Sequence, residues 1–238
     1  MILDELAYSI INTAKGGGIR TDDSRLNSRL VKYWIQQYRN FVIPEATAFG
    51  KDIQPQLIQD LGCLTLTKVD KGECGDSANP VLWGCDIKKV TIPALVDLPK
   101  DRGLVFVGLI DKQTPIEVVS SETAHLQQHR MITSQYTRAY RIGTTLYVIT
   151  PENERLTYIN VRGVFDDPTK VTFCPSGGGT CVCFDEATDQ YPIPDIYITK
   201  VLEQIYQKEL RLTMGVPTDV TNDNKEAIYA QKPTTAKQ

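Results

Sequence analysis

The two histidines of the chain, His125 and His129, stand four residues apart and have the clearest potential for chemistry. On a helix this spacing places both imidazoles on one face, where they can chelate a metal ion. The metalloprotease form of the pattern requires glutamate directly after the first histidine, and Leu126 stands there instead. A polar, exposed helix face is therefore the favoured interpretation, and a metal site is the alternative.

Six cysteines lie in the middle of the chain. Cys174, Cys181 and Cys183 could supply thiolates to a zinc ion, or two of them could form a disulfide, but the CxxC knuckles of zinc ribbons are absent. Cys181 and Cys183 are one strand period apart, which places them on the same face of a sheet. Cys74 and Cys85 bracket a loop that a further disulfide could close. Free thiols, buried or partly buried, are favoured because a non-secreted chain usually keeps its cysteines reduced.

The sequence lacks the other common catalytic and cofactor-binding motifs. Gly16–Gly18 and Gly177–Gly179 lack the following Lys-Ser/Thr of a phosphate-binding loop and are expected to be turns. Asp219–Asn224 lacks the central glycine of a calcium-binding loop. The nucleophile-elbow, kinase and dinucleotide-binding motifs are also missing from the sequence. We therefore expect no enzymatic activity and no cofactor.

The 238-residue chain carries 26 basic and 29 acidic side chains, for a net charge of −3. Nucleic-acid-binding proteins usually have a strong basic excess, because contacts to phosphate supply most of their affinity. The charge balance therefore argues against a protein that grips nucleic acid. A mildly acidic surface still allows DNA to pass nearby without sticking.

Two features predict a cytoplasmic origin without a membrane partner. No apolar run approaches the roughly 18 residues of a membrane span, and the longest is Leu104–Ile110. The first residues, Met1–Glu5, contain acids where a signal peptide has Lys or Arg.

Helical periodicity marks the beginning of the chain. It predicts a first helix over Asp4–Lys15, ended by Gly16–Gly18, because three glycines favour a left-handed cap. The side-chain oxygens of Thr21–Ser24 are candidate caps for a second helix, which is expected to end at Pro44.

The second helix is the strongest local signal in the sequence. Its apolar stripe is formed by Leu26, Leu30, Trp34, Tyr38 and Phe41, with Tyr33 beside it. Val31 and Ile35 widen the apolar surface, so the helix is expected to pack against more than one neighbour. The polar side chains expected on other faces are Arg25, Arg29, Lys32, Gln36 and Arg39.

From about residue 62 the period changes to two, which is typical of strands. Single strands are predicted over Leu64–Thr67, Lys89–Leu95, Gly103–Ile110 and Ile116–Val119. Two hairpins are predicted, one joining Thr145–Thr150 to Arg155–Val161 and one joining Val171–Cys174 to Thr180–Phe184. A short helix over Glu122–Arg130 interrupts the strands. Many short strands at close intervals favour an antiparallel sandwich or barrel.

A third long helix is predicted after Tyr191–Asp195, with Asp195 as its cap and a stop at Gly215 and Pro217. Its apolar stripe consists of Ile198, Val201, Leu202, Ile205 and Tyr206. The polar segment 218–238 cannot bury enough surface to fold alone, so it is either disordered or ordered by a neighbouring molecule.

These elements predict an α+β fold. The N-terminal helical part (1–61) and the C-terminal helix (190–217) are expected to pack together as a helical domain. A β-rich domain (62–189), an antiparallel sandwich or barrel-like structure, is inserted between them. An extended C-terminal arm (218–238) completes the chain.

Two groups of segments carry a resemblance to a known family. The first group is Leu3–Leu6, Asp22–Leu26 and Tyr33–Arg39. The second group is Tyr191–Asp195, Lys208–Leu210, Pro217–Asp219 and Asn222–Asp223. Together they resemble the ring proteins of the head-to-tail connector and tail in crAss-like podoviruses, and more remotely the adaptor or tail-tubular proteins of short-tailed phages. The resemblance covers the outer parts of the chain only.

The resemblance implies a virion structural protein, assembled in the cytoplasm of a host bacterium. It would form a homo-oligomeric ring, of twelvefold symmetry, that contacts the portal and neighbouring tail ring proteins and lines or seals the DNA channel. DNA would pass without sequence-specific binding. The residues expected at subunit contacts are Leu26, Leu30, Tyr33, Trp34, Tyr38, Arg39, Tyr191, Tyr197, Val201, Ile205, Asn222, Asp223 and Tyr229.

Two other functions remain open on the sequence. One is a thiol- or histidine-dependent metal protein or hydrolase, which stoichiometric zinc would support. The other is a β-sandwich host-binding module of the tail. It is disfavoured because the aromatic residues concentrate in the predicted helical ends instead of the β-rich centre.

Overall fold

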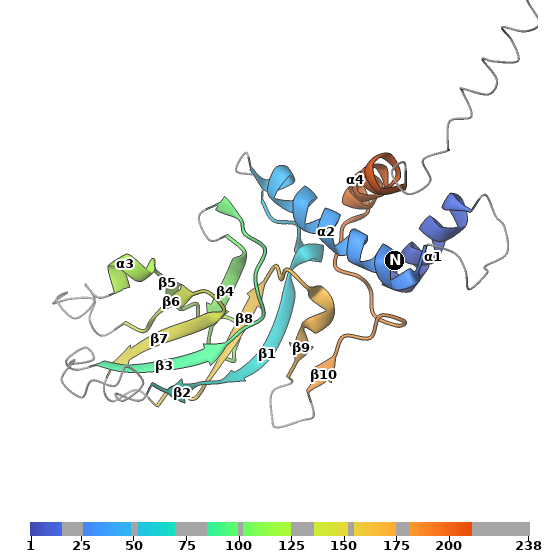
Figure 1. Cartoon of the computed structure of the whole chain (residues 1–238). Helices are drawn as coiled ribbons and strands as arrows, with labels where there is room; N and C mark the ends of the chain where they lie inside the picture. Colours follow the sequence, from blue (N-terminus) through green and yellow to red (C-terminus); the bar gives the residue numbers. More distant parts are fainter. Residues whose placement is uncertain are drawn as a thin grey trace, which may run out of the picture.

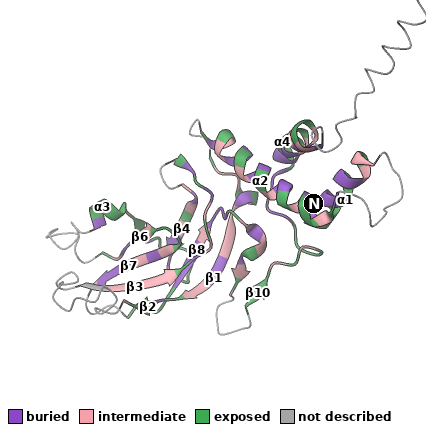
Figure 2. Ribbon diagram, in the orientation of Figure 1, coloured by how far each residue is buried: buried purple, intermediate pink, exposed green. Residues whose placement is uncertain are grey.

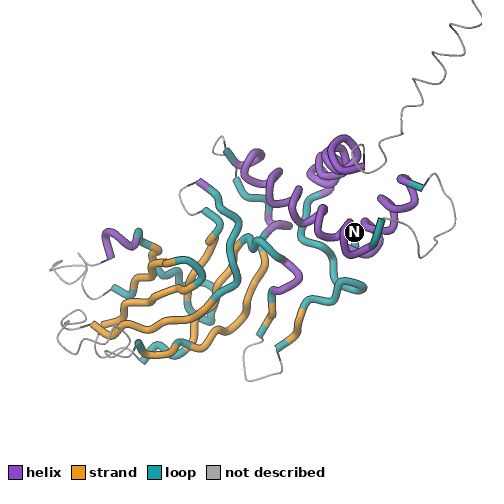
Figure 3. Tube along the Cα trace, in the orientation of Figure 1, coloured by secondary structure: helices purple, strands orange, loops and turns teal. Residues whose placement is uncertain are grey.

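The computed structural model describes residues 1–15, 26–48, 52–69, 85–99, 102–124, 136–151, 155–174 and 181–210. Helices from both ends of the chain gather on one side of the molecule, and the sheets occupy the other (Figures 1 and 3). The α+β class is therefore confirmed. None of the helices that the structure describes is long and apolar enough to cross a membrane.

The first helix, α1 (Leu3–Ala14), begins and ends within one residue of its predicted bounds. Its core face consists of Leu3, Leu6, Ala7, Ile10 and Ile11, all buried at helical spacing. At its start the carboxylate of Glu5 accepts a hydrogen bond from the backbone N–H of Ile2 at 3.2 Å, which satisfies one of the free donors of the first turn.

The second helix, α2 (Ser28–Thr47), differs from its prediction at both ends. Its cap is Asn27, whose side-chain oxygen accepts from the N–H of Arg29 at 3.0 Å, and not a residue of Thr21–Ser24. The helix also continues through Pro44 instead of ending there. Proline removes one backbone hydrogen bond, but the last turn is held by packing, because Ile43 and Thr47 are both buried.

Figure 2 shows buried and exposed residues alternating along α2, and the buried face differs from the predicted stripe. Trp34 and Tyr38 are buried as expected, but Leu30 and Phe41 are 37% and 57% exposed. Arg39, expected on a polar face, is fully buried. The residues that point into the core are Val31, Trp34, Ile35, Tyr38, Arg39, Val42 and Ile43. The physical reason is that α2 packs against both α1 and α4, so the side chains that face these two helices are the buried ones.

The C-terminal helix α4 (Asp195–Gln204) continues as a π-helical segment, η5 (Ile205–Leu210). Tyr197, Ile198, Val201 and Ile205 are buried, which follows the predicted apolar stripe. The expected cap at Asp195 is wrong, because Pro194 holds the cap position and no side chain caps the helix. Asp195 is the first helical residue instead, where its charge favours the positive end of the helix dipole.

The helices share one apolar core, which joins the two ends of the chain. It contains buried residues of α1, α2, α4 and η5, together with Val96, Leu98 and Val164 from the β-rich part. Polar contacts reinforce the packing at its edge, since the hydroxyl of Tyr38 donates to Glu209 at 2.7 Å. This core positions α2 as the central element of the helical side (Figure 1).

The strands form two main sheets and a small hairpin sheet. The three-stranded sheet has the order β1 (Gln59–Thr65), β8 (Tyr158–Gly163), β4 (Leu104–Gly108). The five-stranded sheet has the order β2 (Thr67–Lys68), β3 (Cys85–Thr91), β7 (Thr145–Pro151), β6 (Arg138–Ile142), β5 (Glu117–Val118). The small sheet pairs β9 (Thr172–Phe173) with β10 (Val182–Cys183). All pairings are antiparallel except β5 with β6.

The two main sheets share one core but neither closes into a barrel, so the barrel-like alternative is wrong. The buried set includes Leu61, Val107, Ile159 and Val161 of the three-stranded sheet, and Ala139, Leu146 and Val148 of the five-stranded sheet. Short helices complete the fold: η1 (Pro55–Leu57), α3 (Ser121–Ala124) and η4 (Pro168–Lys170).

One predicted hairpin is confirmed and one is wrong. β9 and β10 pair as predicted, with Phe173 opposite Val182. β7 and β8 do not pair, because β7 lies between β3 and β6 whereas β8 lies between β1 and β4. The connection from β7 to β8 therefore runs from the five-stranded sheet to the three-stranded sheet. The hairpin partner of β7 is β6, which is joined to it through Gly143 at φ 60°.

Candidate assembly interface

Most residues predicted at subunit contacts lie inside the subunit. Ten of them fall in the part of the chain that the structure describes, and the buried ones are Leu26, Trp34, Tyr38, Arg39, Tyr191, Tyr197, Val201 and Ile205. Leu30 and Tyr33 face outward. Asn222, Asp223 and Tyr229 lie outside the described residues.

The outward face of α2 carries a row of apolar side chains. Leu30, Tyr33 and Phe41 are 37%, 59% and 57% exposed, and together they form what we call the outer stripe. Their spacing of three and eight residues, with exposed Gln37 between them, keeps all of them on one side of the helix. The ammonium of Lys208 lies 5.3 Å from the ring centre of Phe41, so one end of the stripe carries a cation.

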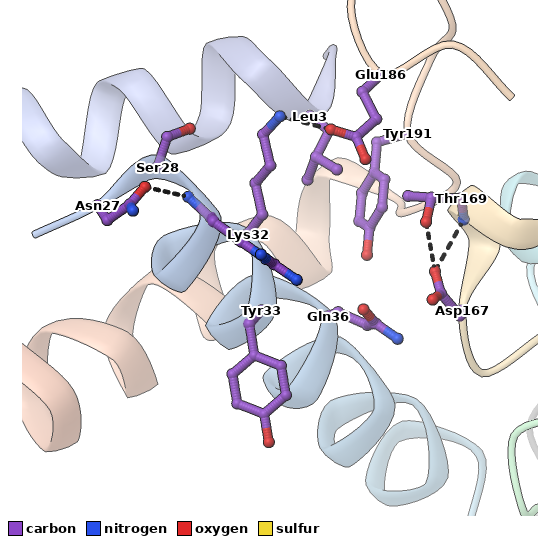
Figure 4. Close-up of a pocket in the computed structure, with 11 residues that line it drawn as sticks. Leu3, Asn27, Ser28, Lys32, Tyr33, Gln36, Asp167, Thr169, Glu186 and Tyr191 are labelled. Carbon is purple, nitrogen blue, oxygen red and sulfur yellow. Dashed lines mark hydrogen bonds and ion pairs between the residues drawn. The ribbon is translucent and has the colours of Figure 1, made fainter.

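A pocket of about 620 Å³ opens beside the first half of α2 (Figure 4). Its walls come from α1, from α2 and from two loops of the β-rich part. The lining residues are Leu3, Asn27, Ser28, Arg29, Lys32, Tyr33, Gln36, Asp167, Thr169, Glu186 and Tyr191. Tyr33 belongs both to the pocket and to the outer stripe, so the two features are continuous.

Lys32 ties the walls of this pocket together. Its ammonium forms ion pairs with Asp4 of α1 and with Glu186 of the loop before α4. Burial alone would lower the pKa of Lys32, but the hydrogen bonds and charges of the two carboxylates outweigh it and raise the pKa above its usual value. Lys32 therefore stays charged and fixes α1 and this loop against α2.

Arg39 lies at the centre of the helical side with no exposed surface. Its guanidinium donates to the backbone carbonyls of Pro192 at 3.1 Å and Phe165 at 2.9 Å, and it lies 5.9 Å from the ring centre of Tyr191. Burial lowers the pKa of Arg39, while the electrostatic influence of the Tyr191 phenol and of the Asp166 carboxylate opposes this shift. One side chain thus joins α2 to the β-rich part and to the segment before α4.

A second polar cluster, around Asp60, holds the β9–β10 hairpin. Asp60 accepts hydrogen bonds from Lys112 at 2.7 Å, from Asn160 at 2.6 Å and from the backbone N–H of Gly62 at 2.8 Å. These contacts support a bulge in β1, where Cys174 of the hairpin pairs with the backbone on either side of Gly62. Gly62 has φ +71°, and a Cβ there would overlap the carbonyl oxygen of Cys174.

The cysteine prediction is wrong for one pair. Cys174 and Cys181 form a disulfide across the β9–β10 hairpin, with Cα atoms 4.2 Å apart. They extend the register in which Phe173 faces Val182, so pairing brings the two thiols together. Cys183 carries a free thiol and is exposed, which also contradicts the expected placement of Cys181 and Cys183 in a core.

Of the five candidate metal ligands, Cys174 and Cys181 are joined in the disulfide and Cys183 is exposed, whereas the two histidines fall outside the described part. His125 and His129 lie there, and so does most of the predicted helix Glu122–Arg130, of which α3 is the beginning. Within the described residues no group of three or more His, Cys, Asp or Glu is arranged to hold a metal ion.

Two features of this region escaped sequence reasoning. Arg39 continues the series Val31, Ile35 at a spacing of four, so periodicity alone would have placed it on the buried face. Its charge led to the opposite prediction. The pocket could not be predicted, because Asp167 and Glu186 reach it from loops far along the chain.

The chain matches the family model of phage tail ring protein 2 over residues 5–230. A search of the curated proteins finds no match. The match includes the β-rich centre, so it extends well beyond the segments that carry the resemblance. A tail ring protein is a structural component of the virion. The chain therefore belongs to the phage tail ring protein 2 family of crAss-like phages.

Proposed function

We propose that this chain forms a closed ring in the connector between portal and tail, where it lines or seals the DNA channel. The ring is twelvefold, is assembled in the host cytoplasm, and contacts the portal on one side and another tail ring protein on the other. Membership of a tail ring family supports an oligomer of tail proteins. The portal contact, the symmetry and the channel are the further steps of the proposal.

The outer stripe is the observation that carries this proposal. Aromatic side chains such as Tyr33 and Phe41 bury large areas at interfaces, and here they are more than half exposed on the central helix. In a ring with head-to-tail contacts, the stripe of one copy would meet a different surface of the next copy. Covering the stripe removes its apolar surface from water and stabilises the ring.

The charge balance suits a channel through which DNA moves. With a net charge of −3, the chain lacks the basic excess that would hold phosphate groups. The division into helical parts (1–61 and 190–217), β-rich domain (62–189) and arm (218–238) belongs to the same proposal. The helical parts would supply lateral contacts, and the β-rich domain would face a neighbouring ring.

The oligomeric state of the full chain tests this function. Mass photometry and electron microscopy of the purified protein, alone and mixed with portal, should show closed rings in at least one condition, since assembly can depend on the portal. A protein that remains monomeric both alone and with portal contradicts the proposal. Rings that form but do not bind portal contradict the connector position only.

A further inference from the structure

The pocket beside α2 has the chemistry of a peptide-binding site. It combines hydrogen-bonding groups from two different elements, the amide of Gln36 on α2 and the carboxylate of Asp167 before η4, with the exposed ring of Tyr33. A free anion is disfavoured because Asp167 and Glu186 also line the space. A polypeptide supplies both carbonyls and N–H groups, and the volume of about 620 Å³ admits several residues of it.

Tyr191 gives independent evidence for an occupant. The side chain is 2% exposed, and its hydroxyl has no hydrogen-bond partner among the described residues. Burial raises its pKa to about 12, against the opposing charge of Arg39, so the hydroxyl stays protonated and available as a donor. Figure 4 shows it pointing toward the space bordered by Gln36 and Asp167. Buried hydroxyls normally find an acceptor, and an entering carbonyl would provide one.

Arg29 supplies a charged contact at the pocket. It is exposed on the first turn of α2 and forms no ion pair with the described part of the chain. Lys32, by contrast, is already paired with Asp4 and Glu186. The pocket therefore offers one uncommitted cation, which favours a segment that carries a carboxylate.

We propose that this pocket receives the C-terminal arm (residues 218–238) of the neighbouring copy in the ring, an inference that rests on the proposed ring. The arm contains Asp219 and Asp223 as partners for Arg29, and Tyr229 to pack beside Tyr33. The chain beyond Leu210 spans up to roughly 90 Å when extended, which is enough to reach another subunit. The neighbour is the source because Tyr33 also belongs to the outer stripe that this neighbour covers.

Photo-crosslinking in the full chain tests the inference. A diazirine amino acid replaces Gln36, and equal amounts of light and isotopically heavy chains are mixed before assembly into rings. We expect crosslinks from position 36 to residues 218–238, with light–heavy pairs as abundant as light–light and heavy–heavy pairs together. If only light–light and heavy–heavy crosslinks are found, the arm binds its own chain and the inference is overturned. Crosslinks confined to other segments or to other proteins also overturn it.

Substitutions at the pocket test which side chains hold the arm. Arg29→Glu should lower the crosslinking yield about tenfold, corresponding to about 1.4 kcal/mol of binding, and Arg155→Glu, an exposed arginine outside the pocket, should leave it unchanged. Tyr191→Phe should lower the yield several-fold while leaving the urea midpoint of the subunit equal or higher, because it removes an unpartnered buried hydroxyl. Equal yields for all three variants overturn the inference.

Ring formation and arm binding can be told apart by experiment. If no ring forms alone or with portal, the proposed function fails. If rings form and position 36 does not crosslink to the arm of another copy, the ring stands and this inference is wrong.

Discussion

Arg39 shows how one buried charge can organise several parts of the fold. It donates to backbone carbonyls in two segments that are distant in sequence, at Phe165 and Pro192. Hydrogen bonds to a charged donor stabilise by about 1.5–3 kcal/mol each, which offsets part of the cost of removing the guanidinium from water. Arginine is suited to this position because its planar group directs several donors at once.

Replacing Arg39 with methionine should therefore destabilise the subunit by about 2–4 kcal/mol, because two buried carbonyls lose their donor. Urea unfolding followed by circular dichroism measures the change. Arg29→Met on the exposed face of the same helix is the matched control and should stay within about 0.5 kcal/mol. Equal effects at the two arginines would show that the buried contacts contribute nothing.

Two glycines with positive φ allow the cost of a left-handed backbone to be compared with the added cost of a steric overlap. Gly143 has φ +60° with open space around it, whereas Gly62 has φ +71° and lies against the backbone of Cys174. Gly143→Ala should cost only about 1–2 kcal/mol, the penalty of a left-handed residue. Gly62→Ala should cost more and should weaken the hairpin contact with β1, seen as faster amide exchange at Cys63 and Cys174. Equal losses of stability in the two variants would contradict this.

Elements were predicted well where a residue pattern acts locally, and poorly where partners are distant. The spacing of Leu6, Ile10 and Ile11 was sufficient for α1, and the same holds for the α4 stripe. The pairing of β7 with β6 could have been found from the turn glycine, Gly143. The placement of β7 and β8 in different sheets has no local sequence signal. It depends on their pairing with β3, β1 and β4, which are distant in the sequence.

The candidate interface follows the same rule. Tyr33 was expected at a subunit contact on the strength of the family resemblance, and it is exposed on the subunit, so that contact stays a prediction. The choice of buried face on α2 depends on neighbours from both ends of the chain, so the sequence could not show that Leu30 and Phe41 of the apolar stripe are exposed on the subunit. The pocket depends on Tyr191 and on loops that only the folded chain brings together.

The unfolding free energy of the subunit should depend on pH through Asp60, which lies beside the bulge in β1. Burial alone would raise the pKa of Asp60, but hydrogen bonds from Lys112, Gly62 and Asn160 hold it below its usual value. The carboxylate therefore stabilises the fold above the unfolded pKa of about 3.9. This contribution is lost as the pH falls through the lower pKa of the folded state.

The variant Asp60→Asn isolates this effect. It should be less stable than the wild type at pH 7, and the difference in unfolding free energy should shrink as the pH falls from about 5 to about 3. Urea unfolding at a series of pH values measures it. A difference that stays constant with pH would show that the charge of Asp60 is not involved.

At the scale of the whole molecule, the outer stripe on α2 is the exposed surface on which the proposed ring depends. The single variants Tyr33→Glu and Phe41→Glu should each prevent ring formation. Each should leave the unfolding free energy of the subunit within about 0.5 kcal/mol of the wild type, because both side chains are more than half exposed. Ile142→Glu is the control, since Ile142 is 56% exposed at the end of β6 and lies outside the stripe. Light scattering under assembly conditions measures ring formation. Rings that persist in both stripe variants would place the lateral contact elsewhere.

The most direct test of the central claim is a reconstruction of the intact virion in which this chain is located. The account predicts a closed ring of copies on the path between portal and tail, surrounding the DNA channel, with the outer stripe of each copy buried against the next. Copies found away from that path, or a ring in which Leu30, Tyr33 and Phe41 face solvent, would contradict it.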